Sequence, residues 1–154
     1  MGKRTPIYER HLQLGGRIVD FAGWDLPVQY SSAIDEHMAV RTNAGLFDIS
    51  HMGEFSVRGR GSSDFLASLI PTSLAKLEDG KGMYSCLCNE SGGIIDDLFI
   101  FRIASDDYYL VVNAGTREKD FSWLKKNLGK DVILEDLSDA TAKSGEWNAP
   151  ERLS

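Results

Sequence analysis

The sequence predicts an α+β fold in which a split β-α-β antiparallel sheet carries its helices on one face. From residue 52 onward, strand-like and helix-like segments follow in the order strand, helix, strand, strand, strand, helix, strand. Turn-forming residues separate these segments. That order is typical of a sheet covered on one side. A length of 154 residues suits one domain, or one small domain with part of another.

A short helix is expected near the N-terminus. Thr5 can cap it, and Pro6 suits its first position because that position needs no N–H donor. The Gly15-Gly16 pair ends it. Two short extended segments, residues 17–21 and 26–30, are expected to follow.

A second helix is expected to begin at Ser32. Asp35 stands three residues later, which is a capping-box signature, and the helix should reach about Asn43. Residues 46–49 alternate apolar and polar side chains only loosely. We therefore expect them to connect this helix to the next strand.

The remaining elements form the predicted sheet and its helices. Five strands are expected, at residues 54–58, 83–88, 94–103, 108–112 and 132–134. Ser62 can cap a helix that Pro71 closes, and Thr116 can cap a second one. Asp120 would lie in the first turn of that second helix, where the macrodipole favours an acidic residue.

Composition excludes several classes of protein. The chain is 42% hydrophobic and 26% charged, as in an ordinary folded domain. Its net charge is −6 and its basic residues form no run, which argues against nucleic acid as a partner. No signal segment and no membrane-spanning run of apolar residues is present. A cytoplasmic protein is therefore expected.

The pair Asp96-Asp97 is the first candidate for chemistry. Strands disfavour aspartate, and burial of an unpaired charge is costly. Alternation should point the two side chains to opposite faces, so they cannot jointly hold a metal ion or act as a paired acid and base. One carboxylate can face a pocket, or it can simply accept backbone N–H bonds at a strand end; the pattern leaves both readings open.

Other clusters have simpler explanations. Asp48, Ser50 and His51 lie too close in the sequence for a catalytic triad, so His51 is expected to be a satisfied loop histidine. Cys86 and Cys88 should share one face of a strand and are expected to be small core residues, with no metal site.

A flat ligand site has several candidates. Met52, Tyr84 and Tyr30 could form apolar walls, although residues of these types, taken singly, are more often part of the core. Asn113 ends a strand and could offer its amide to a heterocycle, or it could be an ordinary turn residue.

Together these segments resemble successive blocks of the glycine cleavage system T-protein, an aminomethyltransferase. The blocks span residues 5 to about 142 in the order and near the spacing of that family. They are Thr5-Pro6-Ile7-Tyr8, Phe21-Ala22-Gly23-Trp24, Leu26-Pro27-Val28-Gln29-Tyr30, Gly45-Leu46-Phe47-Asp48-Ile49-Ser50-His51-Met52, Gly92-Gly93-Ile94-Ile95-Asp96-Asp97-Leu98, Val111-Val112-Asn113-Ala114-Gly115 and Glu118-Lys119-Asp120.

The resemblance implies a function. Members of the family transfer a one-carbon unit from the aminomethyl-lipoyl arm of the H-protein to tetrahydrofolate and release ammonia. The catalytic aspartate of the family maps to Asp97, and Asp96 becomes its structural partner. The pterin pocket of the family places Met52 and Tyr84 against the ring and Asn113 on its polar edge.

The resemblance also implies a domain plan. Residues 1–50 match the opening piece of an incomplete N-terminal lobe, and residues 51–142 match a ferredoxin-like lobe. Residues 143–154 are expected to be a disordered tail outside the family. Two alternatives remain open: a non-catalytic folate-binding relative, and a module that only docks the H-protein.

Overall fold

The computed structural model describes residues 2–148. Its described residues divide into two compact units, one made of residues 2–51 with 142–148 and the other of residues 52–141. The fold is mixed, with antiparallel sheets and few helices, as the sequence predicts. None of the helices in residues 2–148 has the length and apolar character needed to cross a membrane.

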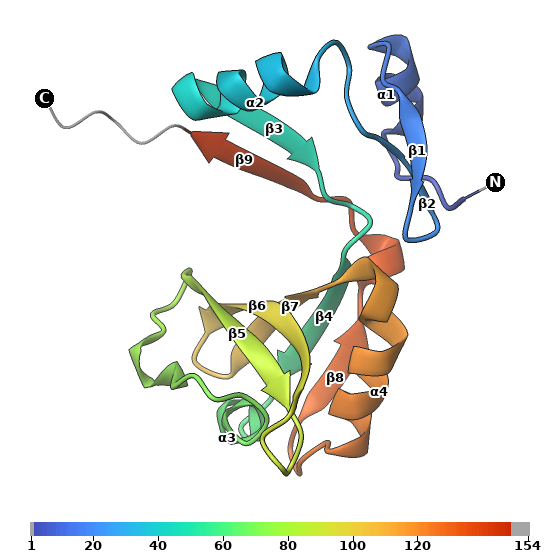
Figure 1. Ribbon diagram of the computed structural model, residues 1–154. Coiled ribbons are helices and arrows are strands. Elements are labelled where there is room, and N and C mark those ends of the chain that lie inside the picture. The colour runs from blue at the N-terminus through green and yellow to red at the C-terminus, as the bar shows by residue number, and fades with distance from the viewer. Residues whose placement is uncertain (1, 149–154) are drawn as a thin grey trace, which may run out of the picture. The chain divides into compact units, whose positions relative to one another are not determined.

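The second unit is built on a five-stranded sheet (Figure 1). Its strands are β4 (Gly53–Arg58), β5 (Gly82–Cys88), β6 (Ile94–Ala104), β7 (Asp107–Val112) and β8 (Ile133–Asp136). They lie in the order β5-β6-β7-β4-β8, and every neighbouring pair is antiparallel. The longer helices are α3 (Ser62–Ala67) and α4 (Arg117–Lys126), with short turns η1 (Leu74–Lys76), η2 (Ala114–Thr116) and η3 (Ser138–Ala140).

One hydrophobic core holds this unit together. Phe55 of β4 and Leu110 of β7 are fully buried in the same cluster as Leu66 of α3 and Leu124 of α4. Because both helices contact one face of the sheet through this cluster, they cover the same side. Each large side chain buried there contributes about 1.5–3 kcal/mol to folding.

The opposite face of the sheet carries an open aromatic row. Tyr84, Phe99 and Phe101 are 55%, 47% and 37% exposed. The rings of Tyr84 and Phe99 lie 5.0 Å apart, and those of Phe99 and Phe101 lie 6.4 Å apart. This row supplies a flat apolar surface on β5 and β6.

The first unit contains two small sheets and two helices (Figure 1). Its elements are α1 (Tyr8–Gln13), β1 (Ile18–Phe21), β2 (Trp24–Pro27), α2 (Ala33–Thr42), β3 (Ala44–Asp48) and β9 (Ser144–Asn148). Ser32 caps α2 as predicted, since its hydroxyl oxygen accepts the N–H of Asp35 at 3.3 Å.

Two expectations are wrong in this unit. The predicted connector at residues 46–49 is largely strand β3, and residues 144–148 of the predicted disordered tail are strand β9. β3 and β9 pair antiparallel from Ala44↔Asn148 to Asp48↔Ser144. Each strand satisfies the backbone groups of the other, so neither needs strong alternation of its own. Residues 149–154 of the predicted tail lie outside the described residues.

Gly59 offers a sharp test of packing in the second unit. Its φ is +112°, and a Cβ there would stand 2.1 Å from the carbonyl oxygen of Asp131. Gly59→Ala is expected to lower the free energy of unfolding by about 3 kcal/mol, because left-handed backbone strain adds to overpacking. Urea denaturation measures this change.

Gly80 provides the matched control. Its φ of +76° is also left-handed, but a Cβ there meets nothing within 4 Å. Gly80→Ala should therefore cost only the conformational part, about 1 kcal/mol. Equal losses in the two variants would contradict the steric contribution at Gly59.

Candidate functional site

The register of the sheet brings three predicted residues to one end of neighbouring strands. Gly53 of β4 and Leu98 of β6 both lie opposite Val112 of β7. One position further along, Met52 and Asp97 flank Asn113 by the same antiparallel register. Residues far apart in the sequence are thus placed side by side by the topology of the sheet.

Asp97 is held by two side chains. The Tyr84 hydroxyl donates to Asp97 Oδ2 at 2.6 Å, and the Asn113 amide donates to Asp97 Oδ1 at 3.1 Å. An ionised carboxylate has about four acceptor positions, and these two bonds occupy one on each oxygen. Asp97 is only half-buried, so each oxygen keeps capacity for a further N–H donor.

The aromatic row continues this site. Tyr84 of β5 lies opposite Phe99 of β6. Phe99 follows Asp97 by two residues, so both side chains lie on the same face of the sheet. The hydrogen bond to Asp97 raises the pKa of the Tyr84 hydroxyl, so Tyr84 stays a donor at neutral pH. An aromatic wall beside a carboxylate and an amide suits a flat, polar-edged heterocycle.

Asp96 points to the helix side of the sheet, as alternation predicts, but it shares Asn113 with Asp97. Asp96 Oδ1 accepts the Asn113 amide at 3.0 Å and the Asp97 backbone N–H at 2.9 Å. Burial alone would raise its pKa. Hydrogen bonds from Thr116, Asn113 and the Asp97 N–H outweigh burial and lower the pKa of Asp96 to about 2.

A second carboxyl group, Asp120 of α4, faces Asp96 from below the sheet. Asp120 is fully buried. Burial first, and then the charge of Asp96, raises the pKa of Asp120 to about 7. Lys119 Nζ lies 3.5 Å from Asp96 Oδ2 and 3.9 Å from Asp120 Oδ1 and donates to the Ile95 carbonyl at 2.7 Å. The sequence assigned Asp120 only a helix-dipole role.

A chain of three hydrogen-bonded side chains in the first unit was also missed. His11 is 4% exposed, and its Nε2 donates to Asp48 Oδ2 at 2.8 Å while Nδ1 lies 2.7 Å from the Tyr30 hydroxyl. Hydrogen bonds from Thr5, His11 and Ser50 overcome burial and lower the pKa of Asp48. All three residues of this chain line a cavity of about 640 Å³ that β1, β2, α2 and β3 surround. Their separation in the sequence gave no signal of this contact.

The reading of His51 as a satisfied loop histidine is wrong. Its Nδ1 is buried and has no hydrogen-bond partner among the described residues. Its ring packs edge-on against Phe21, with centroids 5.7 Å apart, and burial lowers its pKa. Asp48 bonds to His11 instead, and the Ser50 hydroxyl bonds to the Lys143 carbonyl, so these neighbours form no triad.

The two cysteines differ from expectation as well. Cys86 and Cys88 are free and half-buried, whereas the core positions of β5 are Ser85 and Leu87. Cys86 shares the outer face with Tyr84. A register shift between Leu87 and Cys88 alters the alternation that the prediction assumed. Within residues 2–148, no three His, Cys, Asp or Glu side chains are grouped to hold a metal ion.

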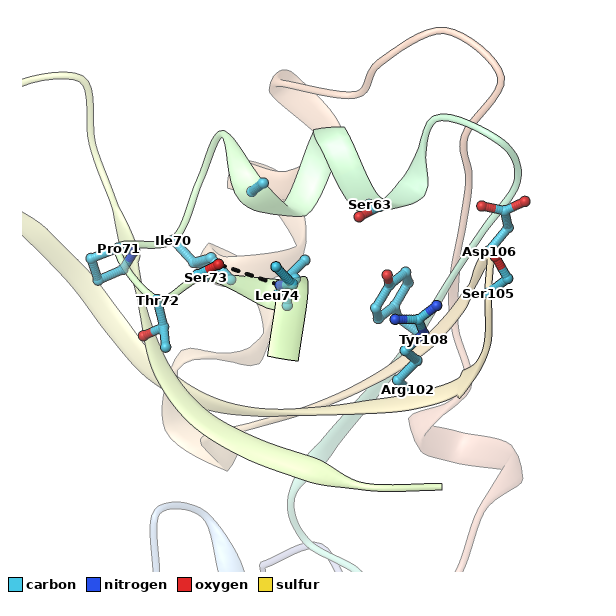
Figure 2. Close-up of a pocket in the computed structure, with 12 residues that line it drawn as sticks. Ser63, Ile70, Pro71, Thr72, Ser73, Leu74, Arg102, Ser105, Asp106 and Tyr108 are labelled. Carbon is cyan, nitrogen blue, oxygen red and sulfur yellow. Dashed lines mark hydrogen bonds between the residues drawn. The ribbon is translucent and has the colours of Figure 1, made fainter. Parts of the chain in front are cut away.

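A further cavity of the second unit lies apart from Asp97. Figure 2 shows it between the segment that follows α3 and the β6–β7 turn. Its volume is about 510 Å³. Arg102 at its wall donates to the Leu77 carbonyl at 2.9 Å and pairs with Asp79 at 2.8 Å. Its lining includes neither Asp97 nor Asn113. It is therefore separate from the candidate site.

Comparisons with known proteins agree with the motifs. A family model described as the GCVT N-terminal domain matches residues 7–144. The chain is 50% identical over 143 residues to an aminomethyltransferase of Geobacillus kaustophilus and 49% identical over 141 residues to one of Thermotoga maritima. These matches cover 93% and 91% of this chain and 39% of each relative.

A solved structure shares the fold. The crystal structure of glycine cleavage system aminomethyltransferase T from Bartonella henselae matches with a TM-score of 0.88 at 37% identity. The match covers 97% of this chain and 41% of that protein. The chain thus spans about two fifths of the length of the relatives that it matches.

Proposed function

The chain belongs to the GCVT N-terminal domain family, as its motifs predict, and from this membership we propose that it carries the folate-binding part of an aminomethyltransferase of the glycine cleavage system. The proposed reaction moves a one-carbon unit from the aminomethyl-lipoyl arm of the H-protein to tetrahydrofolate, with release of ammonia. Tetrahydrofolate is a co-substrate in this scheme.

The contact set of Asp97 carries the proposal. Tyr84 and Asn113 each hold one oxygen of this carboxylate, at 2.6 and 3.1 Å. A carboxylate fixed at both oxygens can accept the N–H groups of a bound folate and stabilise the positive charge that develops as the amine attacks. Asp97 is the catalytic residue in this scheme.

The other site residues bind the ring. Tyr84, backed by Phe99 at 5.0 Å, offers a flat wall, and half-buried Met52 supplies apolar contact at the start of β4. The Asn113 amide fixes Asp97, and its carbonyl oxygen remains to accept from the polar edge of the heterocycle. No metal ion takes part in the proposed chemistry.

The wider assignment follows the same family membership. We propose the lipoylated H-protein and folate as partners, no role for nucleic acid or a membrane, and the cytoplasm as the place of action. We also interpret residues 52–141 as a ferredoxin-like lobe in which β5 is an added edge strand. The order β8-β4-β7-β6 of its other strands supports that interpretation.

Binding of tetrahydrofolate to the chain tests the ligand site. Calorimetry is expected to detect binding, and Asn113→Ala should weaken it about ten- to a hundredfold, because that variant removes a hydrogen bond to a charged group. Asn43→Ala, which removes an exposed amide of the first unit, should leave the affinity unchanged. No binding by the parental chain would contradict the proposal.

Two further outcomes distinguish the alternative functions. Folate binding without transfer from the aminomethyl-lipoyl H-protein, seen also when the chain is part of a protein of its relatives' full length, would indicate a non-catalytic folate-binding relative. Contact with the H-protein in a pull-down, without folate binding, would indicate a docking module.

A further inference from the structure

Two carboxyl groups, fully buried Asp120 and half-buried Asp96, face each other beneath the candidate site without enough hydrogen-bond donors. Asp96 Oδ2 and both oxygens of Asp120 are buried and make no well-formed hydrogen bond as carboxylates. The Thr116 hydroxyl interacts with both groups, but it has only one proton to donate. A buried acceptor without a donor costs about 1–3 kcal/mol, and more when it is charged. The arrangement is therefore unfavourable with both groups ionised.

The charges nearby point the same way. Among the described residues, Lys119 is the cation that forms ion pairs with Asp96 and with Asp120, and its side chain is 49% exposed. One ammonium balances one carboxylate. A single proton on the other carboxyl group would make this cluster of three side chains neutral and would supply a donor between the two carboxyl groups.

Asp120 is the group that keeps the proton. Asp96 Oδ1 already accepts two N–H bonds, from Asn113 and from the Asp97 backbone, and these bonds favour its ionised form. Asp120 receives no such backbone support and is completely buried. A protonated Asp120 can donate to Asp96 Oδ2, which leaves Asp96 ionised and fixed at both oxygens.

We propose that Asp120 is a positioning residue whose carboxyl proton, donated to Asp96, holds Asn113 and the Asp97 main chain in place for the ligand site above. This inference rests on the proposed folate site, but the proton itself can be observed without any ligand. The proposed effect passes from Asp120 on α4 to Asp96. It then passes through the Asn113 amide, which donates to both Asp96 and Asp97.

The proton is expected to leave near neutral pH. The pKa of Asp120 is raised to about 7 by burial and by the charge of Asp96, with Lys119 and the Thr116 hydroxyl acting in the opposite direction. Loss of the proton puts two negative charges against each other in a buried site. Asp96 should then shift, and Asn113 should lose its fixed position.

The first experiment follows the proton in the intact chain by carboxyl ¹³C NMR. One buried aspartate is expected to titrate between about pH 6 and 8, and the Asn113 side-chain amide resonances should change with the same midpoint. Asp120→Asn, which keeps an N–H donor at every pH, should abolish both changes. Glu118→Gln removes an exposed carboxylate from the same helix and should preserve them.

The second experiment measures tetrahydrofolate affinity against pH. The parental chain should bind about tenfold more weakly at pH 9 than at pH 6, a change of about 1.4 kcal/mol. Asp120→Asn should bind equally at both values, and Asp120→Leu, which has no donor, should bind weakly at both. Glu118→Gln should follow the parental chain.

The outcomes separate this inference from the proposed function. Absence of a near-neutral aspartate titration, or an Asn113 amide that ignores it, would overturn the role of Asp120 whatever the ligand. A near-neutral aspartate titration that the Asn113 amide follows, in a chain that does not bind folate, would support the proton between Asp120 and Asp96 and refute the proposed function.

Discussion

Asp97→Asn is expected to slow one-carbon transfer to tetrahydrofolate about 10³-fold, within the range measured when a charged or proton-transferring group is removed from an active site. Asparagine keeps the shape of the side chain but loses its negative charge. In the parental chain Tyr84 and Asn113 each donate to one oxygen of Asp97. In the variant an NH₂ group replaces one of these oxygens, so one of the two hydrogen bonds is lost. The measurement is product formation with the aminomethyl-lipoyl H-protein and tetrahydrofolate.

The effect should fall mainly on kcat. Tyr84, Phe99 and Met52 contact the ring rather than the reacting nitrogen in the proposed scheme, so they should keep most of the binding energy. Glu90→Gln removes an exposed carboxylate from the turn of the same hairpin and should transfer at the parental rate. An Asp97→Asn variant of full activity would refute the catalytic assignment.

Local signals were sufficient for most elements of the second unit. Alternation located the strands, and Pro71 and Gly92-Gly93 located the breaks between elements. The order of these elements also implied the antiparallel sheet. Such signals act within a few residues, so they carry over directly from sequence to structure.

Long-range pairing was the part that local signals could not supply. β3 and β9 are joined by backbone hydrogen bonds between segments about one hundred residues apart in the sequence. Neither segment alternates well, because a strand in a two-stranded sheet depends on its partner more than on its own pattern. The same reason explains why residues 144–148 suggested a tail.

The candidate site shows the same division. The resemblance to the family singled out Asp97, Tyr84 and Asn113, and the register explains how β5, β6 and the end of β7 bring Tyr84 and Asn113 to Asp97. The sequence also contained a signal for the burial of Asp120, which was interpreted only as a helix-dipole residue. Asp120 precedes Leu124 by four residues and so lies on the buried face of α4. An acidic residue at such a position needs a proton or a partner.

Asp120→Asn is expected to stabilise the protein increasingly as pH rises. The pKa of Asp120 is about 7 in the folded chain, against an ordinary value of 3.8. Between these values the folded state keeps a proton that the unfolded state releases, so the free energy of unfolding of the parental chain falls as pH rises. The total loss is on the order of 4 kcal/mol and is complete above about pH 7.

Asparagine does not titrate, so the variant should escape this loss. Near pH 4 the two proteins should unfold with similar free energies, and by pH 8 the variant should be more stable by on the order of 4 kcal/mol. The lowered pKa of Asp96, about 2, acts in the opposite sense, because its contribution is lost only as pH falls below about 4. It therefore lies outside this window.

Urea denaturation from pH 4 to 8, followed by tryptophan fluorescence, to which Trp123 on α4 contributes, measures the difference. Glu118→Gln should give a curve parallel to that of the parental chain, because its carboxylate is exposed. Parallel curves for Asp120→Asn as well would mean that Asp120 is ionised throughout. A buried acid that lowers stability at working pH, directly beneath a fixed carboxylate, is what a site under functional constraint would retain.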